Sequence, residues 1–527
     1  MNQPPQQHDA PTAPAGQPPT AGGLRLGEPR GRWALLATVL GSGMAMLDAT
    51  VVNIALPALG SDLHVDVAGL QWTVNAYTLT LAAFILLGGS LGDRYGHRRV
   101  FVLGAAFFAL ASLLCAISPD ATLLVLARAL QGVGGALLTP SSLAIIAATF
   151  HPDDRGRAIG AWSGLGGVVA AVGPFLGGYL VESVGWRWIF LINLPVALAT
   201  ITVALLRVPE SSDPDAPPRP DIAGALLGAL GLAGVTYALI AAAENGASAG
   251  VWVSAGAGAA GLAAFIATER FSRSPMMPLG IFSSRQFSAA NVVTFAVYAA
   301  LGGIFFILVL DLQVVAGFSP LAAGAALLPV TAIMLLGSPG SGALARRIGP
   351  RAPMTVGPLV SAGGALLLLR VGPGASYTTD VLPAMAVFGL GLTITVAPLT
   401  AAVLAAVPTH ISGLASGVNN AVARTAGLVA VAVLPLATGL SAEDYRQQTA
   451  FDAAFRVAVL LTAAVLAVGG LLSWALVRNP PGSEAVTGDA AEGTKGPTSP
   501  GGDAERGAAP RHRAFCSIDA TPLEPHR

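Results

Sequence analysis

The sequence predicts an all-α integral membrane protein with 14 transmembrane helices. Of its 527 residues, 54% are hydrophobic and 11% are charged, whereas soluble proteins carry roughly 25% charged residues. The charges separate apolar segments of about 20 residues, the length at which an α-helix crosses a bilayer. A charged turn with glycines at 89–98 recurs at 342–351, with Gly, Leu, Arg, Gly and Arg at the same offsets. This repeat indicates two related halves, an organisation found in secondary transporters.

Apolar segments of sufficient length follow one another along the central part of the chain. In order, the predicted spans cover residues 33–57, 71–92, 99–117, 122–147, 158–181, 188–206, 221–243, 251–268, 287–312, 320–344, 354–370, 382–406, 413–437 and 453–477. Residues 1–32 are rich in Pro and Gln and do not have the basic and apolar regions of a signal peptide. Residues 478–527 mix Gly, Pro, Ala and charged residues. We expect both segments to be disordered tails.

The distribution of arginine predicts how the chain lies in the membrane. With a cytoplasmic N-terminus, the inner loops hold most of the loop arginines, among them those at 94–99, 155–157 and 346–351, and the outer loops are acidic or neutral. An even number of spans then returns the C-terminus to the same side. We therefore expect a multi-pass protein of the cell (plasma) membrane with both termini in the cytoplasm. The single lysine, Lys495, and the abundance of Ala and Gly are typical of a GC-rich, bacterial genome.

Several classes of function are disfavoured by the sequence. Because the only lysine lies in the C-terminal tail, there is no P-loop, and we expect no ATP as an energy source. The histidines and cysteines have no metal-ligating spacing. Gly88-x-Ser90-x-Gly92 matches a hydrolase nucleophile pattern that requires a strand-to-helix turn, but here it ends an apolar helix. A net charge of zero offers no basic surface to nucleic acid. We expect no enzyme, no cofactor and no metal site.

Charged side chains inside the spans are the first candidates for function, because burying them in lipid is costly unless they are paired or hydrated. In the first half these are Asp48 in span one and Arg128 in span four. Gln131 shares a helical face with Arg128, which suits a water-lined cavity. Asn53 is a possible hydrogen-bond partner of Asp48, which would make Asp48 merely structural. We assign Asp48, Arg128, Gln131 and Asn53 to a central cavity, with Asp48 as the candidate for proton coupling.

The second half contains two further candidates. Asp311 lies near the outer end of span nine, where its side chain can also simply reach the lipid headgroups. Arg424 lies inside span thirteen, and a functional and a structural role are equally open for it. Carboxylates at positions 48 and 311 favour a cationic substrate slightly over an anionic one.

Two motifs with glycines accompany these charges. In the turn at 89–98 the notable residues are Gly89, Asp93, Arg94, Gly96 and Arg98. The second copy of this turn has Arg346 in place of the aspartate, so only the first copy keeps an acidic residue.

The other motif lies in span five and consists of Gly173, Pro174, Gly177 and Gly178. Proline bends a helix, and glycines at this spacing allow a neighbouring helix to approach closely. The motif suits a helix that moves against a neighbour, although ordinary tight packing would produce the same pattern.

These motifs resemble those of the major facilitator superfamily and, in particular, its fourteen-span drug:proton antiporter branch. The residues that carry the resemblance are, in chain order, 47–57 in span one, 72–77 in span two, the turn at 89–98, 128–134 in span four, 173–178 in span five and 186–195 at the entry to span six. The resemblance covers residues 33–477 and is specific, because the motifs occur in the order and topology of that branch.

The resemblance implies a fold and a function. It implies six-helix bundles at 33–206 and 287–477, with two additional transmembrane helices at 221–268. It also implies a proton-coupled exporter of drugs, antibiotics or related lipophilic compounds, which works by alternating access as a monomer and is driven by the proton gradient. In such a protein the turn at 89–98 gates the cytoplasmic side, and a carboxylate in a low-dielectric cavity takes up and releases the proton. Two alternatives remain open: an exporter of an endogenous lipid, siderophore or metabolite, and a receptor or scaffold that transports nothing.

Overall fold

The computed structural model describes residues 23–214, 216, 219–272, 274–408, 411–440 and 447–479. Within these residues, 14 helical spans are long and apolar enough to cross a membrane, which confirms the fold class predicted from the sequence. The same residues contain no strand beyond one isolated β-bridge. The predicted tails lie outside the described residues except at 23–32 and 478–479.

Most spans are single α-helices: α1 (Pro29–Leu63), α2 (Val67–Tyr95), α3 (His97–Ile117), α4 (Ala121–Thr149), α5 (Pro152–Ser183), α8 (Ile222–Asn245), α9 (Ala249–Phe271), α10 (Arg285–Val314), α15 (Ser412–Thr438) and α16 (Gln448–Leu476). The others consist of two consecutive helical segments: α6 (Trp188–Leu191) with α7 (Asn193–Arg207), α11 (Pro320–Ala326) with α12 (Leu328–Ile348), α13 (Arg351–Leu367) with the 3₁₀ turn η2 (Leu368–Arg370), and the π-turn η3 (Tyr377–Val381) with α14 (Leu382–Ala405). A short 3₁₀ helix, η1 (Leu279–Ser283), precedes α10.

Most helices extend beyond the predicted apolar segments, and several of them begin at a polar residue that caps the first turn. At the start of α2, Asp66 Oδ1 accepts a hydrogen bond from the Gly69 amide (3.0 Å), and at the start of α4, Asp120 Oδ1 accepts one from the Leu123 amide (2.9 Å). Such caps satisfy amides that have no partner within their own helix. Hydropathy detects only the apolar part of a span, so it misses these polar ends.

One predicted boundary is wrong in the N-terminal tail. Residues 1–32 are expected to be disordered, but α1 begins at Pro29 and the segment before it is hydrogen-bonded. The Leu24 amide donates to the Thr149 carbonyl (2.8 Å), and the His151 amide donates to the Leu24 carbonyl (3.1 Å). Backbone hydrogen bonds order this segment without an apolar pattern, which is why the sequence gives no sign of it.

The two halves pack in the same way. In the first half α1 packs against α5 and α7, α2 against α4, and α3 against α4 and α7. In the second half α10 packs against α15 and α16, α12 against α14, and α13 against α14 and α16. Each pair in the first half thus has its equivalent in the second, and the duplicated turn lies at equivalent places, between α2 and α3 and between α12 and α13.

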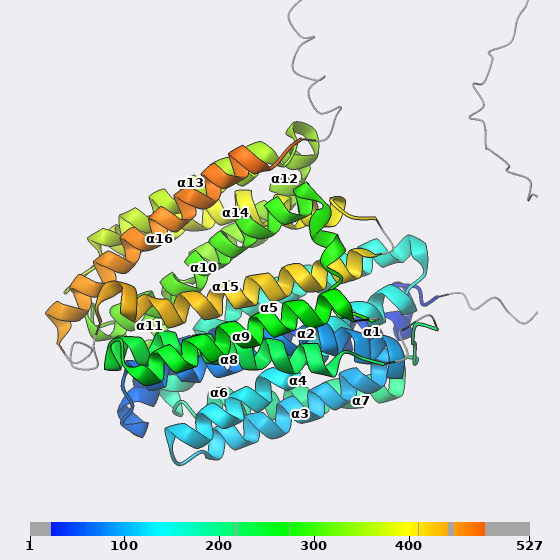
Figure 1. Cartoon of the computed structure of the whole chain (residues 1–527), viewed down its shortest axis with the longest axis horizontal. Helices are drawn as coiled ribbons and strands as arrows, with labels where there is room; N and C mark the ends of the chain where they lie inside the picture. The colour runs from blue at the N-terminus through cyan, green and yellow to red at the C-terminus, as the bar shows by residue number, and fades with distance from the viewer. Residues whose placement is uncertain are drawn as a thin grey trace, which may run out of the picture. The chain divides into compact units, whose positions relative to one another are not determined.

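The two additional helices lie beside the junction of the halves. α8 packs against α2 of the first half and α15 of the second, and α9 packs mainly against α8 (Figure 1). Glycines bring this pair close together: a Cβ on Gly258 would lie 2.5 Å from the backbone nitrogen of Val235. The pair therefore covers the α2–α15 seam from one side.

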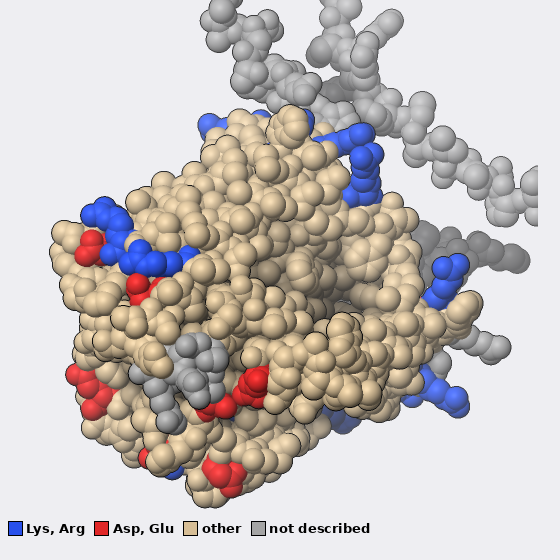
Figure 2. Space-filling view, turned by 60° about the vertical axis from the view of Figure 1, so that its left-hand side comes forward, with Lys and Arg blue, Asp and Glu red and all other residues tan. Residues whose placement is uncertain are grey.

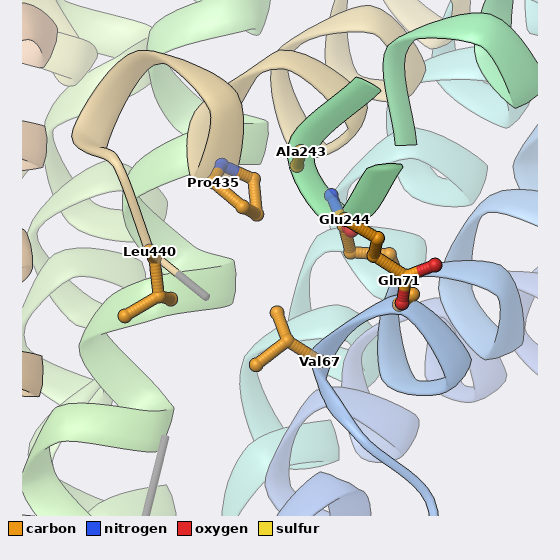
Figure 3. Close-up of a pocket in the computed structure, with 7 residues that line it drawn as sticks. Val67, Gln71, Ala243, Glu244, Pro435 and Leu440 are labelled. Atoms are coloured by element: carbon orange, nitrogen blue, oxygen red, sulfur yellow. The ribbon is translucent and has the colours of Figure 1, made fainter. Parts of the chain in front are cut away.

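A small pocket lies where α2, α8 and α15 meet (Figure 3). Its volume of about 10 Å³ is roughly that of one water molecule. Within it, the Gln71 side-chain amide of α2 donates to the Val431 carbonyl of α15. The seam is thus nearly filled here, and the pocket is too small for a transported molecule. Its lining residues are Val67, Ala68, Gln71, Ala243, Glu244, Pro435 and Leu440.

The halves meet at one end of the helices. We call the end with residues 94–99, 155–157 and 346–351 the arginine-rich end, and the other the opposite end. At the opposite end the Gln313 side chain of α10 donates to the Ile54 carbonyl of α1 (3.0 Å). The Leu321 amide of α11 donates to the Glu182 carboxylate of α5 (3.2 Å). These contacts close the opposite end.

At the arginine-rich end a cleft separates the halves. A Cβ on Gly164 of α5 or on Gly340 of α12 would have no atom of another helix within 4 Å. Figure 2 shows the surface hollowed between the two halves, with arginine side chains around the mouth of the hollow. The cleft therefore opens at the arginine-rich end and is closed at the opposite end.

Candidate transport site

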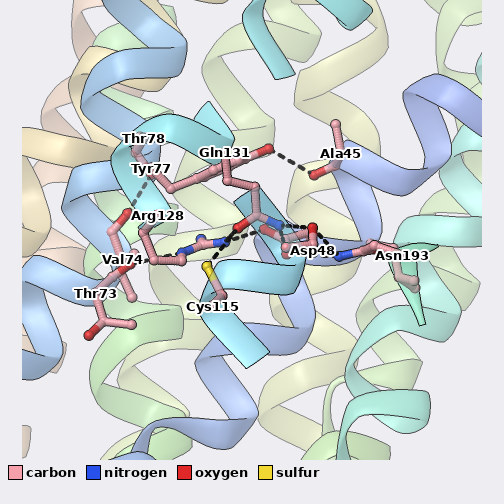
Figure 4. A network of polar contacts seen from close by, with 12 residues as sticks. Ala45, Asp48, Thr73, Val74, Tyr77, Thr78, Cys115, Arg128, Gln131 and Asn193 are labelled. Atoms are coloured by element: carbon pink, nitrogen blue, oxygen red, sulfur yellow. Dashed lines mark hydrogen bonds and ion pairs between the residues drawn. The ribbon is translucent and has the colours of Figure 1, made fainter. Parts of the chain in front are cut away.

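A buried polar cluster joins four helices of the first half (Figure 4). Arg128 of α4 forms an ion pair with Asp48 of α1 and donates to Gln131 Oε1 (2.6 Å). Gln131 Nε2 in turn donates to Asp48 Oδ1 (2.7 Å) and to Ser112 Oγ of α3 (2.8 Å). Asn193 of α7 donates to Asp48 Oδ1 (3.3 Å). Each of these side chains is at most 2% exposed, so the cluster is sealed from solvent in this conformation.

The remaining contacts of Arg128 fix its guanidinium in place. Its Nε donates to the Thr73 carbonyl of α2 (3.1 Å), and its Cζ lies 4.3 Å from the centroid of the Tyr77 ring. Arginine suits this position because its planar, always charged group both donates several hydrogen bonds and stacks on an aromatic face. The Tyr77 hydroxyl donates to the Ala45 carbonyl of α1 (3.1 Å), which ties α2 to α1 beside the ion pair.

Each charge of this cluster is compensated by the other. Asp48 accepts hydrogen bonds from Arg128, Gln131 and Asn193. Removing one partner of a buried ion pair leaves an uncompensated charge and costs about 3–5 kcal/mol. A change in the charge of Asp48 therefore alters contacts to α4 and α7 at once.

The structure brings together three of the four predicted cavity residues. Asn53 does not join Asp48, and its buried Oδ1 accepts no hydrogen bond from the described residues. The physical reason is helical geometry: five residues along an α-helix turn a side chain by about 140° relative to the first. Sequence reasoning assigned no role to Ser112 or Asn193, although each is a polar residue within an otherwise apolar span.

The glycines of α5 lie where this helix meets both α1 and the second half. A Cβ on Gly173 would lie 2.2 Å from Thr50 Oγ1, and one on Gly177 would lie 2.9 Å from Val51 Cγ1. On the other side a Cβ on Gly178 would lie 2.4 Å from the Pro320 carbonyl oxygen of α11. Conversely, a Cβ on Gly324 of α11 would lie 2.1 Å from the carbonyl oxygen of Pro174. The motif therefore forms the close contact between halves at the opposite end.

The turn between α2 and α3 binds the segment that follows α7. The Arg98 amide donates to Glu210 Oε1 (2.9 Å), and the Arg98 guanidinium donates to the Val208 carbonyl at the end of α7 (3.0 Å). The carbonyl of Asp93 accepts a hydrogen bond from the Asp213 amide (2.8 Å). The turn is thus tied to the connection that leads from the first half to α8.

The other two residues of interest, Gly89 and Arg94, both lie near the end of α2. A Cβ on Gly89 would lie 3.7 Å from the Pro140 ring of α4, an ordinary packing distance. Arg94 is exposed, and its Cζ lies 5.4 Å from the centroid of the neighbouring Tyr95 ring.

The second copy of the turn has the same geometry with a different charge. Gly96 and Gly349 both have positive φ (104° and 81°), which glycine adopts without strain. Two residues after each glycine, a backbone amide donates to a side chain that follows the last helix of the same half. That side chain is Glu210 in the first half (2.9 Å) and Asn479 in the second (3.1 Å). The tie is therefore ionic in one half and neutral in the other.

The candidates of the second half lie apart from each other. Asp311 of α10 is 0% exposed, and in the described part of the chain its carboxylate oxygens have no hydrogen-bond partner. Asp452 and Arg456 of α16, an ion pair of 2.9 Å, are the charged groups that act on it. Arg424 of α15 is half-buried.

Comparison with known proteins agrees with this architecture. Residues 38–431 match the family model of the Major Facilitator Superfamily. The chain is 38% identical over 436 residues to the tetracenomycin C resistance and export protein of Streptomyces glaucescens, which covers 81% of this chain and 78% of that protein. It is 36% identical over 451 residues to the methylenomycin A resistance protein of Bacillus subtilis, covering 84% and 93% of the two chains.

A solved structure shows the same fold. The inward-open xylose transporter XylE of E. coli superimposes with a TM-score of 0.58 at 16% sequence identity, over 86% of this chain and 97% of that one. The family model, the bacterial relatives and the fold are thus those of membrane transporters, and the chain belongs to the major facilitator superfamily.

Proposed function

We propose that this protein is a proton-coupled exporter, which moves drugs, antibiotics or related lipophilic compounds out of the cell by alternating access. The observation that carries the proposal is the Asp48–Arg128 pair, a titratable carboxylate and a permanent cation buried together where four helices meet. Stability alone does not explain a buried ion pair, because apolar residues of similar volume often give a protein that is equally stable. A role in coupling accounts for its presence.

The cluster offers a path from protonation to movement of the halves. When Asp48 takes up a proton it loses its charge, and Arg128 loses its counter-ion. α1 then packs differently against α4 and α7. Because the Ile54 carbonyl, further along α1, accepts the hydrogen bond from Gln313, a shift of α1 acts directly on the closed contact between the halves. Protonation thereby changes the balance between the two conformations.

The direction of transport follows from the expected orientation. By the positive-inside rule the arginine-rich end faces the cytoplasm of a plasma-membrane protein. The cleft then opens to the cytoplasm, and the conformation is the one that loads cargo for export. The names of the relatives, antibiotic resistance and export proteins, support small lipophilic molecules as that cargo.

The proposal is tested by efflux from energised vesicles. Purified protein in proteoliposomes is given an imposed pH gradient, and the movement of fluorescent lipophilic compounds is followed with and without the gradient. The Asp48→Asn variant is expected to insert normally and to lose gradient-driven transport, because asparagine keeps the size and hydrogen bonds but cannot titrate.

Asp120→Asn is the matched control, because asparagine caps a helix as well as aspartate and this residue is exposed. It should transport at the wild-type rate. Wild-type rates in Asp48→Asn would contradict the coupling role. Absence of drug transport, together with a change of membrane lipids or metabolites on expression, would indicate an endogenous cargo instead.

A further inference from the structure

We infer that the cleft between the halves binds an acidic group of the cargo, such as a carboxylate, phenolate or sulfonate, and that Arg424 is the residue that recognises it. The inference rests on the proposed transport function, and it names the class of cargo. Three observations support it: the position of Arg424, its lack of a counter-ion among the described residues, and the pairing of Asp48 with Arg128.

Arg424 lies between the halves. It is carried by α15, which packs against α10 of the second half and against α2 of the first. A residue on this helix therefore lies where the two halves meet. Since Arg424 is only half-buried, part of its surface is open to solvent.

The periodicity of α15 agrees with this position. Gly417 and Val431 lie seven residues before and after Arg424, and residues at this spacing share one face of a helix. A Cβ on Gly417 would lie 2.9 Å from Leu86 of α2, and the Val431 carbonyl accepts a hydrogen bond from Gln71 of α2. Arg424 therefore faces α2 midway between two contacts of α15 with that helix.

Arg424 has no counter-ion in the part of the chain that the structure describes, where it forms neither an ion pair nor a hydrogen bond. Arginine does not lose its proton in proteins, so its charge is permanent. Such a charge next to apolar surface must be compensated by water or by a bound anion.

Asp48 of the first half does not compensate this charge. It is paired with Arg128, whose guanidinium also stacks on the Tyr77 ring. The cluster of Asp48 and Arg128 is neutral as a whole, so Arg424 gives the adjoining cleft a net positive charge. A positive cleft with apolar walls concentrates anions and repels cations. This differs from the cationic cargo that the two acidic residues favour when the sequence is taken alone.

Two probe ions of similar shape and opposite charge test whether the site selects by charge. Tetraphenylborate and tetraphenylphosphonium have nearly the same size and apolar surface and opposite charge. Binding of each to purified protein in lipid nanodiscs is measured by equilibrium dialysis, and empty nanodiscs give the background of partition into lipid. We expect the anion to bind at least tenfold more tightly than the cation to the wild-type protein.

Variants locate this preference. In Arg424→Gln the ratio of cation to anion dissociation constants should fall at least tenfold. Arg424→Lys keeps the positive charge, so this ratio should stay close to the wild-type value. Arg155→Gln, on an exposed residue in the first turn of α5, should bind both ions as the wild type does. Monodisperse nanodiscs of Arg424→Lys show whether the site tolerates substitution.

Equal binding of the two ions by the wild type would overturn the inference, as would an unchanged preference in Arg424→Gln. The proposed function is judged separately, by transport under the pH gradient. Gradient-driven efflux of cations alone would keep the exporter and reject the acidic cargo. Preferential binding of the anion without gradient-driven transport would keep the site and reject proton coupling.

Discussion

Arg128 shows how a single residue type meets several demands at one position. Its guanidinium serves three acceptors, the Thr73 carbonyl, the Asp48 carboxylate and the Gln131 side chain, and lies over an aromatic ring. A planar fork with several donors fits this set, whereas an ammonium group offers its donors around a single nitrogen. The residue acts as the hub of the cluster through its shape as well as its charge.

We therefore expect Arg128→Lys to be a poor transporter although it keeps the charge. Lysine cannot reach Thr73 and Gln131 while it pairs with Asp48, so at least one buried acceptor loses its partner at a cost of about 1–3 kcal/mol. Efflux under the pH gradient should fall more than tenfold. Membrane abundance, measured by immunoblot, should fall much less. Wild-type efflux in this variant would show that only the charge matters.

Residue identity predicts the cluster in part. Asp48 and Arg128 stand out because charges inside apolar segments are rare, and the i, i+3 spacing places Gln131 beside Arg128. Ser112 carries no signal of its own, and Asn193 belongs to the motif at 186–195 without a predicted role, because helical periodicity does not reveal which helices are neighbours. That information exists only in the packing of α1, α3, α4 and α7.

At the scale of elements, α5 has two different surfaces along its length. Near the opposite end its glycines lie against α1 and α11, and near the arginine-rich end Gly164 meets no other helix. The sequence predicts a closely packed helix from the motif at 173–178 but does not distinguish these two regions, because both are rich in glycine. Contact at one end and separation at the other allow this helix to act as a pivot between the halves.

The glycines of the packed region should not tolerate a large side chain. In Gly177→Leu the new Cβ would lie 2.9 Å from Val51 Cγ1 and 3.2 Å from the Val51 Cα, so backbone must move. Overpacking of this kind costs about 1–3 kcal/mol and opposes closure of the opposite end. We expect loss of gradient-driven efflux, with reduced abundance or a shifted conformation seen by limited proteolysis.

Gly164→Leu on the same helix is the control, because a Cβ there meets no other helix within 4 Å. It should be inserted at wild-type abundance and retain efflux. Equal behaviour of the two variants would show that close contact at Gly177 is not required for transport.

At the scale of the whole molecule, the duplication explains why so much of the fold can be predicted from the sequence. Hydropathy predicts the 14 spans, and the repeated turn predicts that the halves are equivalent. What the sequence does not predict is the conformation. In this conformation α5 contacts α11 at the opposite end and leaves a cleft at the arginine-rich end. Its free energy differs only slightly from that of the alternative conformation, in which the same helices pack at the other end.

The repeat also leaves the two halves unequal in charge. The first half contains the neutralised pair of Asp48 and Arg128, and α15 of the second half carries Arg424. These charges do not lie on equivalent helices: the pair joins α1 and α4, whereas α15 is the equivalent of α5. The two halves thus share the packing of their helices and differ in the charges that those helices carry.

Orientation in the membrane is the property on which the direction of transport depends. Ser248 is exposed between α8 and α9 at the opposite end, and Gly280 is exposed in η1 at the arginine-rich end. In a background with Cys115→Ala and Cys516→Ala, the Ser248→Cys variant should react with a membrane-impermeant maleimide in intact cells. The Gly280→Cys variant should react only after permeabilisation, because the excess of arginine keeps that end in the cytoplasm. The reverse pattern would place the cleft on the outside and make this conformation the one that releases cargo.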